Sequence, residues 1–147
     1  MTKDEFVQQA YAAALKSSER SGMPAMVTLA QAALESNWGQ SKLSEEAHNY
    51  FGIKAHGKHE RIQMTTNECI KGAKIVIKAE FAKYLSMLDC FQCRDGILAR
   101  GASYAVVRER RGDEAAFIVE IAKHWATDPK YAEKLLAVLD EVRGMVK

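Results

Sequence analysis

The chain has 147 residues, of which 48% are hydrophobic and 27% are charged. This mixture is typical of one globular domain with an apolar core. The 21 basic and 19 acidic side chains leave a net charge of +2, which is too balanced to indicate a nucleic-acid-binding protein. No run of about 18 apolar residues is present, so the sequence does not predict insertion into a membrane.

The cysteines and the N-terminal residues bear on the compartment. Three cysteines, Cys69, Cys90 and Cys93, leave at least one thiol unpaired, which favours synthesis in a reducing compartment over a disulfide scaffold. Residues 1–6 lack the apolar segment of a signal peptide. We therefore expect synthesis in the cytoplasm, and delivery by another route if the protein acts outside it.

The first predicted helix spans about residues 2–19. Thr2 and Glu5 have the spacing of a capping box, and the pair Ser21-Gly22 can end the helix. The apolar residues recur at helical spacing and predict one buried stripe. Its members are Phe6, Val7, Ala10, Tyr11, Ala14 and Leu15.

The second predicted helix begins near Pro24, which suits a first helical turn, and ends at Gly39 in a left-handed conformation. Its apolar residues cover most of the circumference, which predicts a helix inside the domain. They are Met26, Val27, Leu29, Ala30, Ala33 and Leu34. One polar stripe remains on a single face and consists of Thr28, Gln31, Glu35 and Trp38.

Glu35 lies near the C-terminal end of this apolar helix. Burial there disfavours the charged carboxylate, so we expect a raised pKa. A carboxyl group that stays protonated near neutral pH suits a general acid. The alternative is a glutamate that simply reaches water from the end of the helix.

A short helical turn is expected within residues 41–47, followed by an aromatic and polar loop at residues 48–52. From Glu60 to Phe81 the apolar period changes to two, which predicts a β-hairpin with Lys71-Gly72 at its turn. This register places Glu68 opposite Ile75. Glu68 is then either a functional carboxylate or an edge-strand charge that discourages aggregation.

Four further helical segments are expected after the hairpin. They are residues 86–98, capped by Ser86, residues 104–108, residues 113–125, capped by Asp113, and a last helix that begins at Asp128-Pro129. The charged residues 108–112 are expected to form a solvated turn. The pattern predicts a mostly α-helical α+β domain, spanning residues 1–147, with one small β-hairpin.

Three ordered motifs carry a resemblance over about Met23 to Val138. They are "LAQAALESNWGQSKL", "HNYFGIKA" and "WATDPKYAEKLL". Together they resemble the glucosaminidase family, glycoside hydrolase family 73, which includes the flagellar peptidoglycan hydrolase and many autolysins. The resemblance implies a lysozyme-like fold.

The resemblance also implies roles for particular residues. Glu35 would be the general acid, and the stretch "TTNECIKGAKIVIKAEFAKY" resembles the family hairpin whose glutamate, the second active-site carboxylate, matches Glu68. Asn49 and Phe51 match the family's "NxFGIK" segment beside the cleft. Trp125 replaces the first tyrosine of the family's "YATDPxY" motif and lacks its hydroxyl. The positions expected to bind or shape the substrate are Asn49, Phe51, Trp125, Tyr131 and Trp38.

The activity that the resemblance implies is that of an endo-β-N-acetylglucosaminidase. It would cleave the β-1,4 bond between N-acetylglucosamine and N-acetylmuramic acid in peptidoglycan. We expect a monomer that needs no cofactor, and a bare domain of this kind also resembles a phage or prophage endolysin. The alternative is a non-catalytic peptidoglycan-binding or assembly module on the same fold, which the presence of both Glu35 and Glu68 argues against.

A metal site is the competing chemistry. His56, His59, Cys90 and Cys93 offer imidazole and thiol ligands of the kind zinc prefers. Cys90 and Cys93, however, are three residues apart in a predicted helix, where they suit packing. We interpret them as packing residues and expect no metal.

Overall fold

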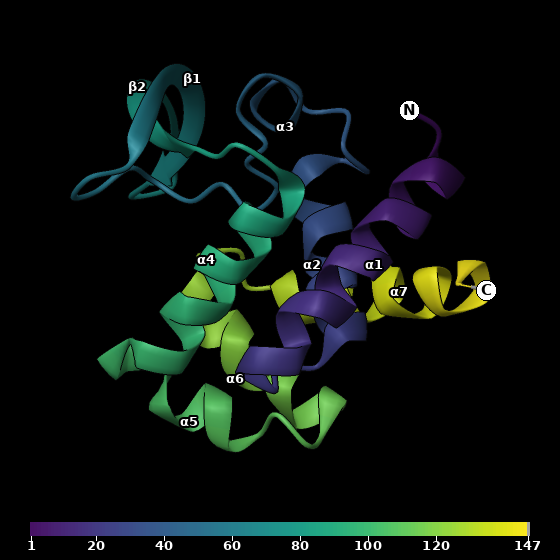
Figure 1. Ribbon diagram of the computed structural model, residues 1–147. Helices are drawn as coiled ribbons and strands as arrows, with labels where there is room; N and C mark the ends of the chain where they lie inside the picture. Colours follow the sequence, from purple (N-terminus) through teal and green to yellow (C-terminus); the bar gives the residue numbers. More distant parts are fainter. Residues whose placement is uncertain (147) are drawn as a thin grey trace.

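The structure, a computed structural model, describes residues 1–146. They form a mostly helical α+β fold with one two-stranded antiparallel sheet, as predicted (Figure 1). The elements are α1 (Lys3–Ser21), α2 (Ala25–Ser36), α3 (Lys42–Ala47), β1 (Glu60–Ile70), β2 (Ala73–Lys83), α4 (Met87–Arg100), the 3-10 helix η1 (Ala102–Tyr104), α5 (Ala105–Glu109), α6 (Glu114–Trp125) and α7 (Tyr131–Met145). Among the described residues, no helix is both long and apolar enough to cross a membrane.

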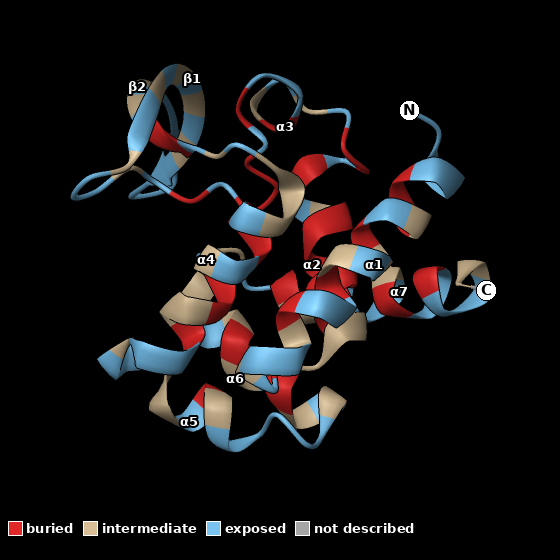
Figure 2. Ribbon diagram, in the orientation of Figure 1, coloured by how far each residue is buried: buried red, intermediate tan, exposed pale blue. Residues whose placement is uncertain are grey.

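Helix α2 lies at the centre of the helical body, as its apolar circumference predicts. It packs against α1 and α7, and α1 also packs against α4. Figure 2 shows buried residues along α2 and on the faces of its neighbours, whereas the hairpin is mostly exposed or intermediate. The core is continuous from Phe6 in α1 through Leu29 and Ala33 in α2 to Leu135 in α7.

The end of α2 differs from the prediction. The helix ends at Ser36, and Asn37 caps it with a φ of 50°. Trp38 and Gly39 then continue in the left-handed region, with φ values of 58° and 76°. Gly39 is required here because a Cβ atom would lie 2.6 Å from Cδ1 of Phe6. The early end of the helix turns Trp38 away from the polar stripe on which it was expected.

The hairpin has the predicted register. Glu68 pairs with Ile75, and the turn residues Lys71 and Gly72 have φ values of 52° and 80°, as a tight hairpin turn requires. Figure 1 shows the hairpin projecting from the helical body, on the side opposite the two chain ends. Its base is anchored by a bridge between Lys54 and Phe81.

The predicted caps at Thr2, Ser86 and Asp113 are present, and each side chain accepts a backbone N–H bond. One expectation about a single residue was wrong. Leu15 is 45% exposed instead of inward-facing. The solvated turn expected at residues 108–112 is present as an exposed turn at residues 110–112. Arg108 precedes it in α5, and its Nη1 donates to the carbonyl oxygens of Leu98 and Gly101 at 3.0 and 2.9 Å. It thereby caps the last carbonyl groups of α4.

Candidate active site

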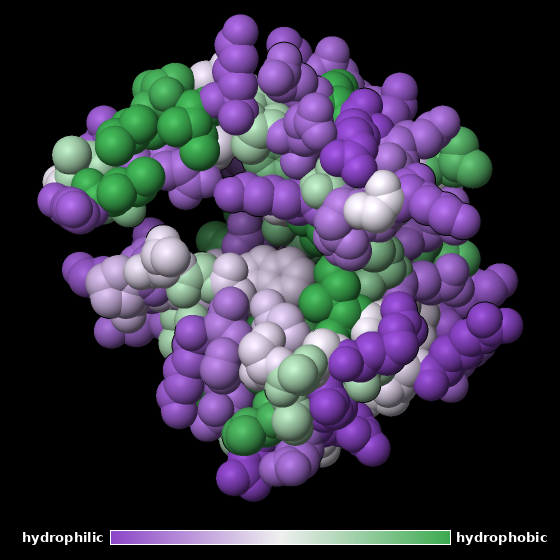
Figure 3. Space-filling model, turned by 90° about the vertical axis from the view of Figure 1, so that its left-hand side faces the viewer, coloured by the Kyte–Doolittle hydropathy of each residue, from purple (hydrophilic) through white to green (hydrophobic). Residues whose placement is uncertain are grey.

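A cavity of about 570 Å³ lies between the base of the hairpin and the helical body. Figure 3, which looks onto this side of the molecule, shows a hollow between an overhanging upper part and the body below. The wall is formed by the end of α2, by α3, by the loop before the hairpin, by both strands, and by the end of α6 with the loop that follows it. The lining residues are Glu35, Leu43, Phe51, Gly52, Lys54, Thr66, Glu68, Phe81, Trp125, Ala126, Thr127 and Asp128.

Glu35 lies on the last turn of α2 and faces this cavity. The residue is accessible to solvent from the cavity, yet enough protein surrounds the carboxyl group for desolvation to raise its pKa above the ordinary value of 4.5. A side-chain hydrogen bond from Tyr131 acts in the opposite direction and lowers the pKa. Both expectations for Glu35 therefore hold in part: it reaches water, and its charged form is disfavoured.

Tyr131, the first residue of α7, lies behind Glu35 and not on the cavity wall. The residue is only 4% exposed, and its hydroxyl oxygen accepts a 3.1 Å hydrogen bond from Nε2 of Gln31. Desolvation, followed by the nearby Glu35 carboxyl, raises the pKa of the Tyr131 phenol. Tyr131 is therefore a neutral hydroxyl that contacts the candidate acid, and the structure places no part of it on the wall where a substrate would lie.

Glu68 faces the same cavity from the hairpin. Its Oε1 lies 3.5 Å from Nζ of Lys54, and the two side chains are 34% and 61% exposed. An ion pair this open to water is held weakly, so the Glu68 carboxylate is free to interact with a ligand in the cavity. Lys54 was not predicted as a site residue, although it stands within the "FGIKA" segment.

Three aromatic side chains, Phe51, Phe81 and Trp125, line the cavity. The rings of Phe51 and Trp125 lie edge to face, with centroids 6.3 Å apart at 76°. Phe51 is 2% exposed, whereas Trp125 is only partly buried. Trp125 therefore offers the apolar surface on which a sugar ring can pack, with the buried Phe51 packed against it, and it contributes no hydroxyl group.

Asn49 supports the cavity from beneath and does not line it. Its amide nitrogen donates to the carbonyl oxygens of Ile53 and Ala82, both at 2.9 Å. Its amide oxygen accepts the N–H groups of Phe51 and Ile53. These bonds tie the loop that carries Phe51 to the end of β2, so the structure gives Asn49 a positioning role.

Trp38 is not brought to the cavity either. It is 8% exposed, and Nζ of Lys3 lies 4.4 Å from the centroid of its ring. Three polar residues that sequence reasoning missed do line the cavity, namely Thr66, Thr127 and Asp128. Asp128 was interpreted only as the start of a helix. Its place in the same motif as Trp125 could have indicated that it lies near the site.

The Asp128 carboxylate is already engaged by its neighbours. Its Oδ2 lies 2.6 Å from Nζ of Lys134, and its Oδ1 accepts the Lys130 N–H at 2.8 Å. These hydrogen bonds, from Lys134 first, lower the pKa of Asp128. It is therefore an ionised group at the rim, unsuited to donate a proton.

The candidate zinc ligands lie apart from this cavity. Cys93 Sγ accepts a 3.2 Å hydrogen bond from the Tyr84 hydroxyl and lies 3.8 Å from Nε2 of His59. Cys90 is fully buried, and its Sγ accepts the Tyr50 N–H at 3.4 Å. Within residues 1–146, no three side chains of histidine, cysteine, aspartate or glutamate converge as metal ligands would.

Comparison with known proteins identifies relatives of this chain in sequence and in fold. Exo-glucosaminidase LytG of Bacillus subtilis is 35% identical over 120 residues, which is 78% of this chain and 43% of that protein. Peptidoglycan hydrolase FlgJ of Salmonella typhimurium is 36% identical over 134 residues, 87% of this chain and 42% of that protein. The chain thus spans less than half the length of these two relatives.

A crystal structure of a peptidoglycan hydrolase mutant from Sphingomonas sp. A1 superposes with a TM-score of 0.86 at 30% identity, covering 97% of both chains. This similarity confirms the expected lysozyme-like fold. Residues 11–144 match the family model "Glucosaminidase: Mannosyl-glycoprotein endo-beta-N-acetylglucosaminidase". The chain therefore belongs to the glucosaminidase family of glycoside hydrolases.

Proposed function

We propose that this chain hydrolyses the glycan strands of bacterial peptidoglycan, at the β-1,4 bond between N-acetylglucosamine and N-acetylmuramic acid. The observation that carries the proposal is the pairing of two unlike carboxyl groups on one cavity. Glu35 has a raised pKa, and Glu68 lines the same cavity from the hairpin, beside Lys54. Relatives named peptidoglycan hydrolase and exo-glucosaminidase support the choice of substrate.

Glu35 acts as the general acid. Its protonated carboxyl group donates a proton to the glycosidic oxygen while the bond to the anomeric carbon breaks, so the leaving sugar departs as a neutral alcohol. The Tyr131 hydroxyl holds the Glu35 side chain in place. It also stabilises the carboxylate that forms after proton transfer, because a hydrogen bond to the charged form favours that form.

Glu68 acts as the second carboxylate. Positive charge develops at the anomeric carbon in the transition state, and an ionised carboxylate nearby stabilises it and can accept a proton from the attacking water. Attack by the acetamido group of the substrate would leave Glu68 with the electrostatic role alone. Lys54 keeps Glu68 in the cavity without immobilising it, because both side chains remain open to water.

Trp125, supported by the buried Phe51, forms the wall on which the sugar ring packs, and Thr66 and Thr127 offer hydroxyl groups at the same cavity. Apolar surface with a few polar groups is the usual composition of a ligand site. We assign Asn49 to holding the Phe51 loop, because its side-chain amide is fully used in bonds to the backbone.

The test is digestion of purified cell walls, followed by mass spectrometry of the products. Glucosaminidase cleavage leaves N-acetylglucosamine at the new reducing end, whereas a muramidase leaves N-acetylmuramic acid. Long products released early indicate internal cleavage, and single disaccharides released from the start indicate an exo-acting enzyme. Glu35→Gln serves as the inactive control. A folded parent protein that releases no reducing ends from any wall would refute the proposal and favour a binding module.

A further inference from the structure

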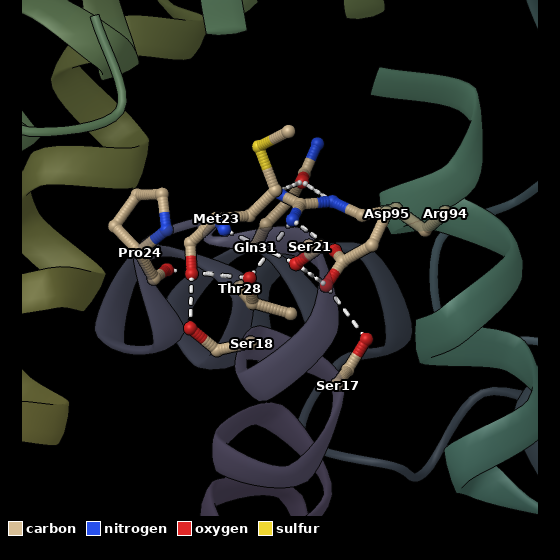
Figure 4. A network of polar contacts seen from close by, with 9 residues as sticks. All are labelled: Ser17, Ser18, Ser21, Met23, Pro24, Thr28, Gln31, Arg94 and Asp95. Atoms are coloured by element: carbon tan, nitrogen blue, oxygen red, sulfur yellow. Dashed lines mark hydrogen bonds and ion pairs between the residues drawn. The ribbon is translucent and has the colours of Figure 1, made fainter. Parts of the chain in front are cut away.

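A charged side chain lies in the core behind the cavity. Arg94 of α4 is 0% exposed, and its Nη1 lies 2.9 Å from Oδ1 of the buried Asp95. The other oxygen of Asp95 accepts the hydroxyl groups of Ser17 and Ser21 at 2.6 and 2.8 Å. Figure 4 shows these groups converging from α1, α2 and α4. Buried ion pairs contribute little net stability compared with apolar packing, so stability alone does not explain this arrangement.

The remaining Arg94 donors fix the side chain of Gln31. Nε and Nη2 both donate to Oε1 of Gln31, at 3.0 and 2.6 Å, and Nη1 also donates to Thr28 at 2.8 Å. A guanidinium group carries only donors, so the amide oxygen of Gln31 must face it. The amide nitrogen of Gln31 is thereby directed at the other neighbour, the hydroxyl of Tyr131, at 3.1 Å.

The direction of these hydrogen bonds also decides where the phenolic proton of Tyr131 points. The Tyr131 oxygen receives a proton from Gln31, so the single phenolic proton is left for the Glu35 carboxyl group. One Glu35 oxygen is then occupied as an acceptor from behind. Because the carbonyl oxygen of a protonated carboxyl group is the better acceptor, this contact favours the acidic proton on the other oxygen, toward the cavity.

We propose that Arg94 and Gln31 are positioning residues that act through Tyr131 to orient the acidic proton of Glu35 toward the substrate. The inference rests on the proposed function, in which Glu35 is the general acid. The chain of donors runs in one direction, from Arg94 to Gln31, Tyr131 and Glu35. It links residues 63 and 100 positions apart in sequence. Arg94 also lies 5.4 Å from the ring centroid of Phe51, so it supports the apolar wall as well.

The discriminating variant is Gln31→Glu. A carboxylate at position 31 keeps the length and the bonds to Arg94, but it can only accept from Tyr131. The phenolic proton then turns toward position 31, and Glu35 loses its hydrogen bond. We expect kcat to fall by up to about 10²-fold, as misplacement of a catalytic group does, with KM unchanged. A purely structural role predicts parent-like activity instead.

The pH profile provides a second readout. The Tyr131 bond lowers the pKa of Glu35, so its loss raises that pKa, and the basic limb of the pH–rate profile moves to higher pH. Other charged groups around Glu35 also influence this limb and are unchanged in the variant. Across the cavity they are Lys54, Glu68 and Asp128, and behind it Arg94.

A double-mutant cycle with Tyr131→Phe separates the chain of donors from the added charge. Without the phenol, Gln31→Glu should cause no further fall in kcat, and any remaining shift of the limb reports the added charge alone. Uncharged Gln31→Met offers the phenol no strong competing acceptor, so kcat should fall much less than in Gln31→Glu. Tyr131→Phe alone removes the donor to Glu35, so it should reproduce the fall and serves if Gln31→Glu does not fold. Ser17→Ala is the matched control: it weakens the same buried network, so it should lower the melting temperature and leave the pH profile unchanged.

Additive effects in the cycle, or a folded Gln31→Glu protein with parent kcat and pH profile, would overturn the proposal. Failure of the proposed function has a different signature. In that case Glu35→Gln itself would remain active, whereas an inactive Glu35→Gln beside an active Gln31→Glu refutes only the positioning roles.

Discussion

Replacing Glu35 with glutamine removes the transferable proton from the cavity and leaves a side chain of the same length and shape. The amide oxygen of the new side chain can still accept the hydrogen bond from Tyr131, so the surrounding structure should be retained. General acid catalysis is worth about 10²–10⁴-fold in rate. At about 1.36 kcal/mol for each factor of ten, the variant should lose roughly 3–5 kcal/mol of transition-state stabilisation.

The same substitution has a predictable effect on stability. Desolvation raises the pKa of Glu35 in the folded protein above 4.5, so the folded state binds its proton more tightly than the unfolded state. The associated stability is fully present below the unfolded pKa and is lost as pH rises through the folded pKa. The parent should therefore lose stability in this window. Glu35→Gln should not, and its advantage in melting temperature should grow with pH.

The assay combines the lytic rate on purified walls, measured as a function of pH, with thermal melts monitored by circular dichroism. Glu35→Asp provides a control that retains a proton but withdraws it from the substrate, and it should keep a residual rate. A folded Glu35→Gln enzyme with near-parent activity would refute the assignment of the general acid. Equal pH dependence of the two melting curves would refute the raised pKa.

Four further changes test other parts of the site and its support. Glu68→Gln should reduce the rate less than Glu35→Gln if the acetamido group of the substrate attacks, and as much if Glu68 activates water; rates of both variants on one wall preparation decide this. Trp125→Tyr should keep most of the activity and Trp125→Ala should lose it through the missing apolar wall, and a fully active Trp125→Ala would remove this residue from the site. Gly39→Ala should lower the melting temperature because its Cβ would lie 2.6 Å from Phe6 at a φ of 76°, a combination that destabilises by more than about 1 kcal/mol; an unchanged melt contradicts it. Cys90→Ala with Cys93→Ser should stay within a few-fold of parent activity under reducing conditions, and stoichiometric zinc that is lost together with the fold on chelation would contradict this expectation.

Much of the fold was predictable because local rules govern it. The apolar circumference of α2, the cap at Ser86 and the alternation from Glu60 to Phe81 each depend on residues a few positions apart. The hairpin register followed from the turn at Lys71-Gly72, and with it the pairing of Glu68 and Ile75. The resemblance to the glucosaminidase family added the expectation that Glu35 and Glu68 share a site, and both do line one cavity.

Only the tertiary structure decided which side chains support Glu35 and Glu68. Trp38 left its expected face because three consecutive residues adopt positive φ, a backbone path that helical periodicity does not encode. Asn49 was expected to touch substrate, but the bonds that occupy its amide come in part from Ala82, on the far side of the hairpin.

The hydrogen bonds from Arg94 through Gln31 to Tyr131 are the clearest example of contacts that only the tertiary structure decided. Each of these residues has an ordinary local explanation, as a charged, polar or aromatic position on its own helix. Their hydrogen bonds form only where the packing of α2 against α7, and of α4 beside them, brings atoms 63 and 100 residues apart into contact. Sequence patterns over one helix describe which face is apolar. The partner that a buried polar group finds, and the direction in which its proton points, depend on the packing of several helices at once.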